Sequence, residues 1–152
     1  MVQRSIATRW RGIYSYDKTP NLPSSCVDTE FDMRLKLGWF GRFTGGIVDS
    51  AQGIPEPATI RGRLSGSQVS FTKLYVSLWV EDLSGEFKTI PGEKSYVVYY
   101  AGKFIEQRNR IVGNWEIRPE RRWIDGEEWE FPGNSGTWTA EATSNLFDSA
   151  NY

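Results

Sequence analysis

The 152-residue chain contains no histidine. Without an imidazole, the sequence excludes Ser-His-Asp and Cys-His catalysis, histidine-ligated haem and nearly all zinc sites. Its single cysteine, Cys26, permits neither an internal disulfide nor an iron–sulfur cluster. We therefore expect no cofactor, and this cysteine usage favours a cytoplasmic location.

Long apolar runs and an excess of one charge are also lacking. No segment approaches the roughly 20 apolar residues of a membrane-spanning helix, and residues 1–10 lack the apolar core of a signal peptide. The 18 basic and 19 acidic residues give a net charge of −1, with no long run of either sign. Because nucleic-acid binding usually requires a basic patch or stripe, we expect neither nucleic acid nor a membrane as a partner.

Aromatic residues and glycine are abundant instead. Aromatics make up 14% of the chain, including seven Trp, and there are 15 Gly. This composition, without a collagen period, favours a β-protein with many turns. The length predicts a single domain over residues 1–152, which is large enough to bury its own core.

Apolar residues alternate with polar ones along much of the chain, which is typical of half-buried strands. In residues 30–39, for example, Phe31, Met33 and Leu35 share one face, and charged residues occupy the other. Such patterns predict strands over 7–17, 30–39, 41–50, 58–66, 69–80, 95–106, 110–117 and 135–142. The connections at 81–94 and 118–135 are predicted to be irregular.

Eight strands with mostly short turns and no convincing amphipathic helix predict an all-β fold. Closure of the sheet removes its exposed edges, so we expect a single eight-stranded antiparallel up-and-down β-barrel. A β-sandwich is the competing architecture.

Glycine recurs beside bulky residues within these strands, as in Gly113 and Trp115. A phosphate-binding loop is excluded because no Gly-Lys-Ser/Thr follows. Closing a small barrel requires sharp bending, which glycine permits. We therefore interpret Gly113 as a bending point, with Trp115 filling the space beside it.

The second half of the chain carries four short motifs in order. They are Phe-x-Lys-x-Tyr at 71–75, Tyr-x-Gly at 100–102, Ile-x-Gly-x-Trp at 111–115 and Ser-Gly-Thr-Trp at 135–138. Over residues 69–140 this order resembles the calycin-like barrels, the group that holds the lipocalins and avidins. The resemblance implies a barrel architecture and leaves the ligand open.

Lys73 shares a strand face with Phe71 and Tyr75, and that face is expected to line the barrel. A buried amine must be paired or must shift toward its neutral form. It would anchor a carboxylate ligand or act as a nucleophile. The alternative is a structural pair with a carboxylate, or a side chain that reaches the barrel rim.

Tyrosine hydroxyls facing the same space would orient the polar end of a ligand, although ordinary core packing is the alternative. The candidate ligand-binding residues are Tyr14, Lys73, Tyr75, Tyr100, Trp115 and Trp138. No residue is predicted to be catalytic.

Residues 120–131 alternate charge with aromatics. Trp123, Trp129 and Phe131 are candidates for a lid over an open barrel end or for a partner contact. A solvated loop is the alternative. A calcium site from the acidic residues is a weaker one, because their spacing matches no known calcium loop, and no metal site is predicted.

The predicted strand at 95–106 is apolar on both faces, which indicates that its outer face is covered. A homodimer contact through this strand or through 118–135 is one explanation. The 118–135 segment folding back over the strand is the other.

These features favour a non-enzymatic protein that binds a small apolar or amphipathic ligand in the barrel lumen. A structural or protein-interaction module with a packed barrel is the alternative. A lyase or isomerase that uses Lys73 and tyrosine is less favoured. The cavity volume separates the first two, because ligand pockets usually measure about 300–1,000 Å³.

Overall fold

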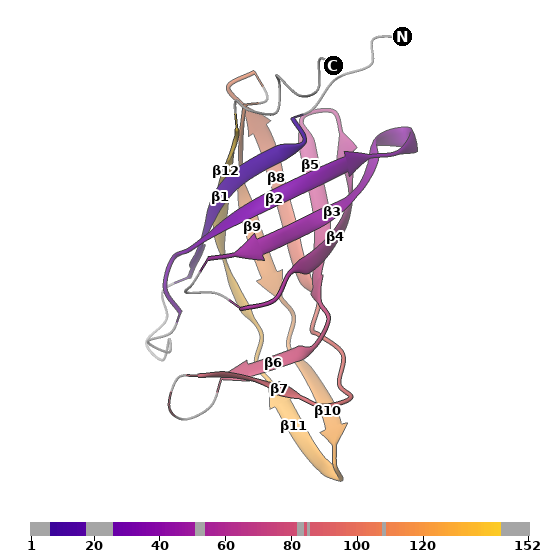
Figure 1. The fold of residues 1–152 in the computed structure, drawn as a ribbon, viewed down its shortest axis with the longest axis vertical. Coiled ribbons are helices and arrows are strands. Elements are labelled where there is room, and N and C mark those ends of the chain that lie inside the picture. The colour runs from indigo at the N-terminus through magenta and orange to yellow at the C-terminus, as the bar shows by residue number, and fades with distance from the viewer. Residues whose placement is uncertain are drawn as a thin grey trace.

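The chain forms a closed antiparallel barrel of eight strands, with two hairpins projecting from one of its ends (Figure 1). The structure is a computed structural model that describes residues 7–17, 26–50, 54–81, 84, 86–107 and 109–143. Each barrel strand pairs with the barrel strands before and after it in sequence, and the first pairs with the last. The expected all-β, up-and-down barrel is thus confirmed, and the sandwich is wrong.

The barrel order is β1-β12-β9-β8-β5-β4-β3-β2. The bounds are β1 Arg9–Tyr16, β2 Thr29–Leu37, β3 Arg42–Asp49, β4 Ala58–Ser65, β5 Gln68–Tyr75, β8 Val98–Ile105, β9 Arg110–Ile117 and β12 Asn134–Ala142. A single 3₁₀ turn, η1 (Trp39–Gly41), joins β2 to β3.

Two short hairpins interrupt the barrel sequence at the same end (Figure 1). One pairs β6 (Leu78–Glu81) with β7 (Phe87–Ile90), and the other pairs β10 (Glu120–Ile124) with β11 (Glu127–Phe131). β7, β10 and β11 fall where connections were expected. β6 overlaps the end of the strand expected over 69–80, which instead stops at Tyr75. These expectations were wrong because the hairpin strands are only four or five residues long, which leaves too few alternating positions to mark them as separate strands.

The β10–β11 hairpin did leave one signal in the sequence. Its turn is Asp125-Gly126, and both residues have positive φ, 52° and 80°. Asp-Gly between two extended segments is a strong hairpin indicator, because such turns require positive φ at both central positions.

The inward faces of the eight strands fill the barrel with large side chains. Trp10, Met33, Phe43 and Ile111 are at most 2% exposed. Phe71 stacks on Tyr100 with ring centroids 4.7 Å apart, and Trp138 meets both rings edge-on. Leu37 continues the inward alternation of Phe31, Met33 and Leu35, but it is 39% exposed because β2 ends there and the chain turns into η1.

Several glycines in the barrel lie opposite aromatic residues on neighbouring strands. Gly12 pairs with Phe31, and Gly136 pairs with Trp115. A Cβ on Gly136 would lie 2.6 Å from Trp115 Nε1, so only glycine leaves room for this indole. Trp115 therefore covers Gly136, while Gly113 pairs with Trp138.

Adjacent glycines in β3 provide a test of this close packing. A Cβ on Gly45 would lie 1.9 Å from the Arg34 carbonyl oxygen, whereas on Gly46 its nearest contact would be the Ala58 carbonyl oxygen at 3.5 Å. We expect Gly45→Ala to lower the free energy of unfolding by about 1–3 kcal/mol and Gly46→Ala to lower it much less. Urea denaturation measures both, and equal losses would contradict the close approach.

Candidate binding site at the barrel mouth

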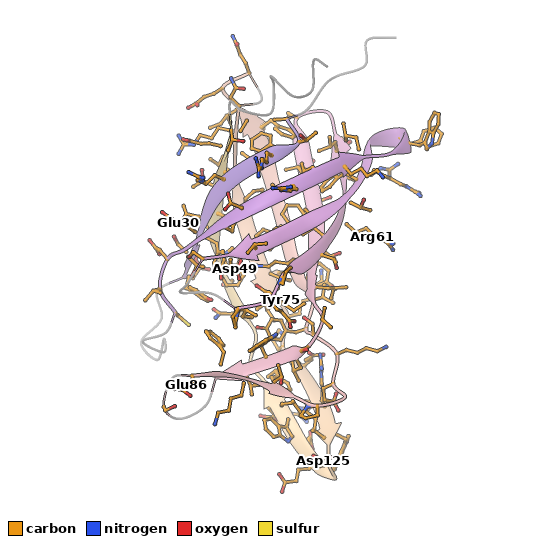
Figure 2. The ribbon with its side chains drawn as sticks, viewed as in Figure 1. Glu30, Asp49, Arg61, Tyr75, Glu86 and Asp125 are labelled. Carbon is orange, nitrogen blue, oxygen red and sulfur yellow. The ribbon has the colours of Figure 1, made fainter. Side chains whose placement is uncertain are left out.

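A buried ion pair lies inside the barrel toward the end that carries the hairpins. Asp49 is the last residue of β3 and Lys73 lies on β5; their side chains are 0% and 3% exposed. Lys73 Nζ donates to Asp49 Oδ1 at 3.2 Å. Figure 2 shows Asp49 close to Tyr75, in the part of the barrel nearer the hairpins.

Tyrosines complete the surroundings of both charges. Tyr75 and Tyr14 donate their hydroxyls to Asp49 Oδ2 at 2.6 and 3.3 Å. The ammonium of Lys73 lies 4.8, 5.1 and 5.9 Å from the ring centroids of Tyr75, Tyr14 and Tyr100, within cation–π range. The carboxylate thus accepts three hydrogen bonds, and aromatic rings surround the ammonium.

This pairing is one of the arrangements expected for a buried lysine, but its partner was not identified from the sequence. Asp49 closes a strand weakened by Gly45 and Gly46, next to a predicted turn, and it resembles an ordinary loop residue. Only the shear of the barrel brings the end of β3 to the end of β5, which is not its neighbour.

Burial dominates the protonation behaviour of the cluster. It lowers the pKa of Lys73, while the Asp49 carboxylate acts in the opposite direction. Burial, and then Asp49, raises the pKa values of Tyr14, Tyr75 and Tyr100 above 10.0. The same causes raise the pKa of Tyr96 to about 12. These phenols therefore remain neutral hydrogen-bond donors at physiological pH.

A cavity of about 60 Å³ opens beside this cluster at the barrel mouth. The described residues that line it are Tyr14, Tyr16, Ile54, Lys73, Tyr75, Phe87, Tyr96, Val98, Tyr100, Trp115 and Ile117. Phe87 comes from β7, so the β6–β7 hairpin contributes to the wall. The volume is far below the roughly 300 Å³ at which typical ligand pockets begin, because aromatic rings fill the lumen beyond it.

The structure brings five of the six candidate ligand-binding residues together and separates the sixth. Tyr14, Lys73, Tyr75, Tyr100 and Trp115 all line the mouth cavity. Trp138 instead lies in the packed core, 2% exposed, and its indole donates to the carbonyl oxygens of residues 101 and 114 at 3.2 Å each.

The sequence reasoning missed other residues of the site. Besides Asp49, these include Tyr16, Tyr96 and Phe87. Tyr16 lies two positions after Tyr14 on the same strand face, and this spacing was the available signal. Phe87 had none, because the hairpin that places it was not predicted.

The candidate lid residues Trp123, Trp129 and Phe131 lie on the β10–β11 hairpin, which carries Asp125 at its far tip (Figure 2). Trp123 is 72% exposed, and Trp129 stacks on Phe131 with centroids 6.2 Å apart. Among the described residues, the hairpin that lines the mouth cavity is β6–β7 and not this one.

Two of the acidic residues on the same hairpin form ion pairs with an arginine. Arg121 pairs with Glu128 at 3.4 Å and with Glu130 at 3.0 Å. These carboxylates therefore neutralise a cation of their own hairpin.

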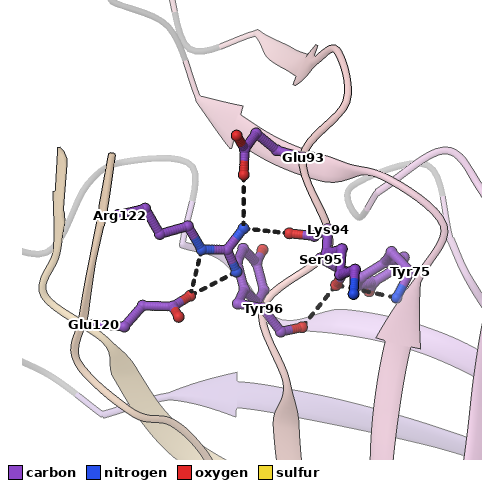
Figure 3. A network of polar contacts seen from close by, with 7 residues as sticks. All are labelled: Tyr75, Glu93, Lys94, Ser95, Tyr96, Glu120 and Arg122. Carbon is purple, nitrogen blue, oxygen red and sulfur yellow. Dashed lines mark hydrogen bonds and ion pairs between the residues drawn. The ribbon is translucent and has the colours of Figure 1, made fainter. Parts of the chain in front are cut away.

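Arg122 attaches the β10–β11 hairpin to the segment that enters β8 (Figure 3). Its guanidinium donates to Glu120 Oε1 at 2.8 Å and to the Lys94 carbonyl oxygen, and it lies 3.8 Å from Glu93 Oε2. The next residue, Ser95, accepts a hydrogen bond from the backbone N–H of Tyr75 at 3.2 Å. The hairpin is thus connected to the backbone that positions the mouth tyrosines.

The outer face of β8 is partly covered by a residue from 118–135. The guanidinium of Arg118 lies 3.8 Å from the ring centroid of Tyr99. Because Tyr99 pairs with Glu116, two residues before Arg118, this is a diagonal contact between neighbouring strands. The homodimer contact and the folding back of 118–135 both stay predictions.

No family model, curated protein or solved structure matches the chain. Within the described part of the chain, no helix has the length and apolar character needed to cross a membrane.

The ion pair predicts strong coupling between its two partners. Asp49→Asn leaves the ammonium of Lys73 without a countercharge in a dry site, and we expect it to lower the free energy of unfolding by about 3–5 kcal/mol. Lys73→Met removes that charge, so the double variant should be more stable than the sum of the single effects by about 0.5–3 kcal/mol. A double-mutant cycle by urea denaturation measures this coupling, and additive effects would refute it.

The buried tyrosines predict loss of stability in alkali. Their raised pKa values mean that the folded protein retains protons which the unfolded chain releases above pH 10. The free energy of unfolding should then fall by up to about 1.4 kcal/mol per pH unit for each such tyrosine.

Lys73 acts in the opposite direction over a different window. Because the pKa of Lys73 is lowered on folding, the unfolded chain binds this proton more tightly than the folded protein. Its contribution to the free energy of unfolding therefore rises with pH up to 10.5 and is constant above that pH. Denaturation midpoints and phenolate absorbance between pH 8 and 12 test both effects. Tyrosines that ionise near pH 10 while the protein stays folded would contradict the first.

Proposed function

We propose that this protein is a non-enzymatic, calycin-like binding protein that holds one small amphipathic ligand at the barrel mouth. The proposal rests on the lining of the mouth cavity. Lys73 and several tyrosines form its inner surface, here called the floor, and place polar groups among aromatic rings. Ligand pockets typically combine apolar walls with a few convergent polar groups. Because aromatic side chains fill the lumen, we propose that the ligand lies at the opening and not deep inside the barrel.

The charge balance of the floor favours an uncharged polar end on the ligand. Asp49 already neutralises Lys73, so a ligand carboxylate would bring a second buried negative charge beside one ammonium. A carbonyl or hydroxyl oxygen would accept a hydrogen bond from the ammonium of Lys73 without that cost. The expected class is therefore a small neutral molecule with an aromatic or short apolar body and one oxygen acceptor.

The β6–β7 hairpin supports binding at this end. Trp79 packs with Phe87 against the small cluster of Ile54, Ala58 and Tyr75 that lies beside the cavity. The buried Trp79 Nε1 finds no acceptor among the described residues. A buried donor without a partner costs about 1–3 kcal/mol, so a rearrangement of this hairpin on binding that gives Trp79 Nε1 an acceptor would be favourable.

A protein-interaction module with a packed barrel is the second candidate. The small cavity volume of about 60 Å³ and the aromatic filling of the lumen favour it. In that case the ion pair is structural, and the mouth binds no small molecule.

Benzamide and benzoate provide a matched pair of probes, because they share shape and size and differ in charge. We expect benzamide to shift NMR signals of the mouth residues, and benzoate to bind at least roughly tenfold more weakly, which corresponds to about 1.4 kcal/mol. Stronger binding of benzoate would refute the neutral ligand class. No binding by either probe would favour the interaction module.

Variants locate the binding site. Lys73→Met should abolish benzamide binding, and Ile54→Trp should block the mouth without touching the ion pair. Lys103→Met, on the exposed face of β8, is the matched control and should leave binding unchanged. Binding that survives both mouth variants would place the probe elsewhere.

A further inference from the structure

The η1 turn between β2 and β3 lies at the barrel end opposite the hairpins (Figure 1), and it carries two exposed aromatic side chains. Trp39 and Phe40, here called the aromatic tip, are 85% and 83% exposed. Exposing two adjacent large rings forgoes the free energy of burying them, about 1.5–3 kcal/mol for a residue such as Phe. No folding requirement explains their exposure at a surface turn.

The tip is held in place by its backbone. Phe40 adopts left-handed φ and ψ of 58° and 34°, which is uncommon for a bulky residue. Gly38 N–H donates to the Arg42 carbonyl oxygen at 2.7 Å, which closes the turn. Gly41 packs so tightly that a Cβ there would lie 2.5 Å from the Leu64 carbonyl oxygen. Strained backbone that is held this firmly is a reason to look for a function.

Basic side chains cover the outer sheet surface directly behind the tip. This cationic face consists of Arg34, Lys36, Arg42, Arg61 and Arg63, all exposed, from β2, β3 and β4. Arg42 follows the tip and lies opposite Arg63 on the neighbouring strand. In the next row of the sheet, Lys36 and Arg61 lie on either side of Thr44. Alternate residues on a strand lie about 7 Å apart, within the Debye length of about 8 Å at physiological ionic strength.

None of these five cations forms an ion pair with a carboxylate in the part of the chain that the structure describes. The five arginines that do form such pairs lie elsewhere: Arg11, Arg110, Arg118, Arg121 and Arg122. On β2, the next outward residue before Arg34 is Asp32, which already pairs with Arg11. In Figure 2, Arg61 stands away from the barrel wall. The face therefore concentrates unneutralised positive charge on a protein whose net charge is −1.

We propose that the aromatic tip and the cationic face together dock onto an anionic lipid membrane surface. Trp and Phe partition into the membrane interface, and cations behind them meet anionic headgroups, each worth about 1 kcal/mol near the surface. An open groove of about 610 Å³, lined by Lys36, Arg42, Arg61 and Arg63, lies where the headgroups would contact the sheet.

The arrangement favours a membrane over single-stranded nucleic acid. Base-stacking platforms place aromatic rings within a positively charged groove that follows the phosphate backbone. Here the rings stand on a turn beyond the strands, and the exposed positions of β2, β3 and β4 carry no aromatic ring among the cations. This geometry suits a membrane surface, because the two rings can enter the interface while the cations behind them contact the headgroups.

Co-sedimentation of the full chain with vesicles tests the proposal. The protein should bind vesicles of equimolar phosphatidylcholine and phosphatidylserine, bind pure phosphatidylcholine far more weakly, and dissociate as salt is raised. Trp39→Ser combined with Phe40→Asn should reduce the partition coefficient at least roughly tenfold. Asn tolerates the left-handed backbone, so this variant keeps the turn.

Charge variants separate electrostatics from ring insertion. Arg61→Gln and Arg63→Gln should each reduce binding to the anionic vesicles roughly fivefold. Matched controls at the other end are Trp123→Ser, an exposed Trp without a cationic face, and Arg121→Gln, an arginine with carboxylate partners. Both should bind like the unaltered protein.

Three outcomes would overturn the proposal. The first is no preference for the anionic vesicles, and the second is equal losses in the control variants. The third is binding of oligothymidine, but not of vesicles, that depends on the same tip and arginines, which would assign the surface to nucleic acid.

Discussion

Filling a closed barrel with side chains from all eight strands is the constraint on which this structure depends. The lumen holds several Trp, Tyr and Phe rings, and they fit because glycines stand opposite them on neighbouring strands. Gly136 opposite Trp115 shows the geometry: a single methyl group there would collide with the indole and with the Ser15 carbonyl oxygen. Close packing of this kind excludes water from the lumen.

Exclusion of water determines the chemistry of the barrel interior. A charged lysine is tolerated in such a place only with a countercharge and further hydrogen bonds. Asp49 supplies the countercharge, and Tyr14 and Tyr75 donate to the remaining lone pairs of the carboxylate. The cluster is therefore neutral as a whole. Lys73, Tyr14 and Tyr75 reach the cavity at the mouth, where the packing of the lumen ends.

A solid middle leaves the two ends of the barrel for recognition. At one end, the β6–β7 hairpin contributes to an opening walled by tyrosines, and Arg122 attaches the second hairpin nearby. At the other, the η1 turn holds Trp39 and Phe40 in front of cations from three strands. The first surface is neutral and concave and the second is cationic and protruding, so the proposed partners of the two ends differ in kind.

The barrel, and most of the side chains that line it, could be predicted from the sequence pattern alone. Period-two alternation gave the eight barrel strands, and it placed Tyr14, Lys73, Tyr75, Tyr100 and Trp115 on inward faces, because alternation is a local property of each strand. The hairpin strands are four or five residues long, too short for this pattern to reveal them, although Asp125-Gly126 marked one turn.

Contacts between residues that are distant in the sequence could be identified only from the folded barrel. The partnership of Asp49 with Lys73 depends on barrel shear, and the cationic face depends on the pairing of β2, β3 and β4. Its basic residues are dispersed between positions 34 and 63, so no run of charge revealed them. The lumen is packed because the side chains of all eight strands together fill it. Their total volume cannot be compared with the space in the barrel from any single segment of the sequence.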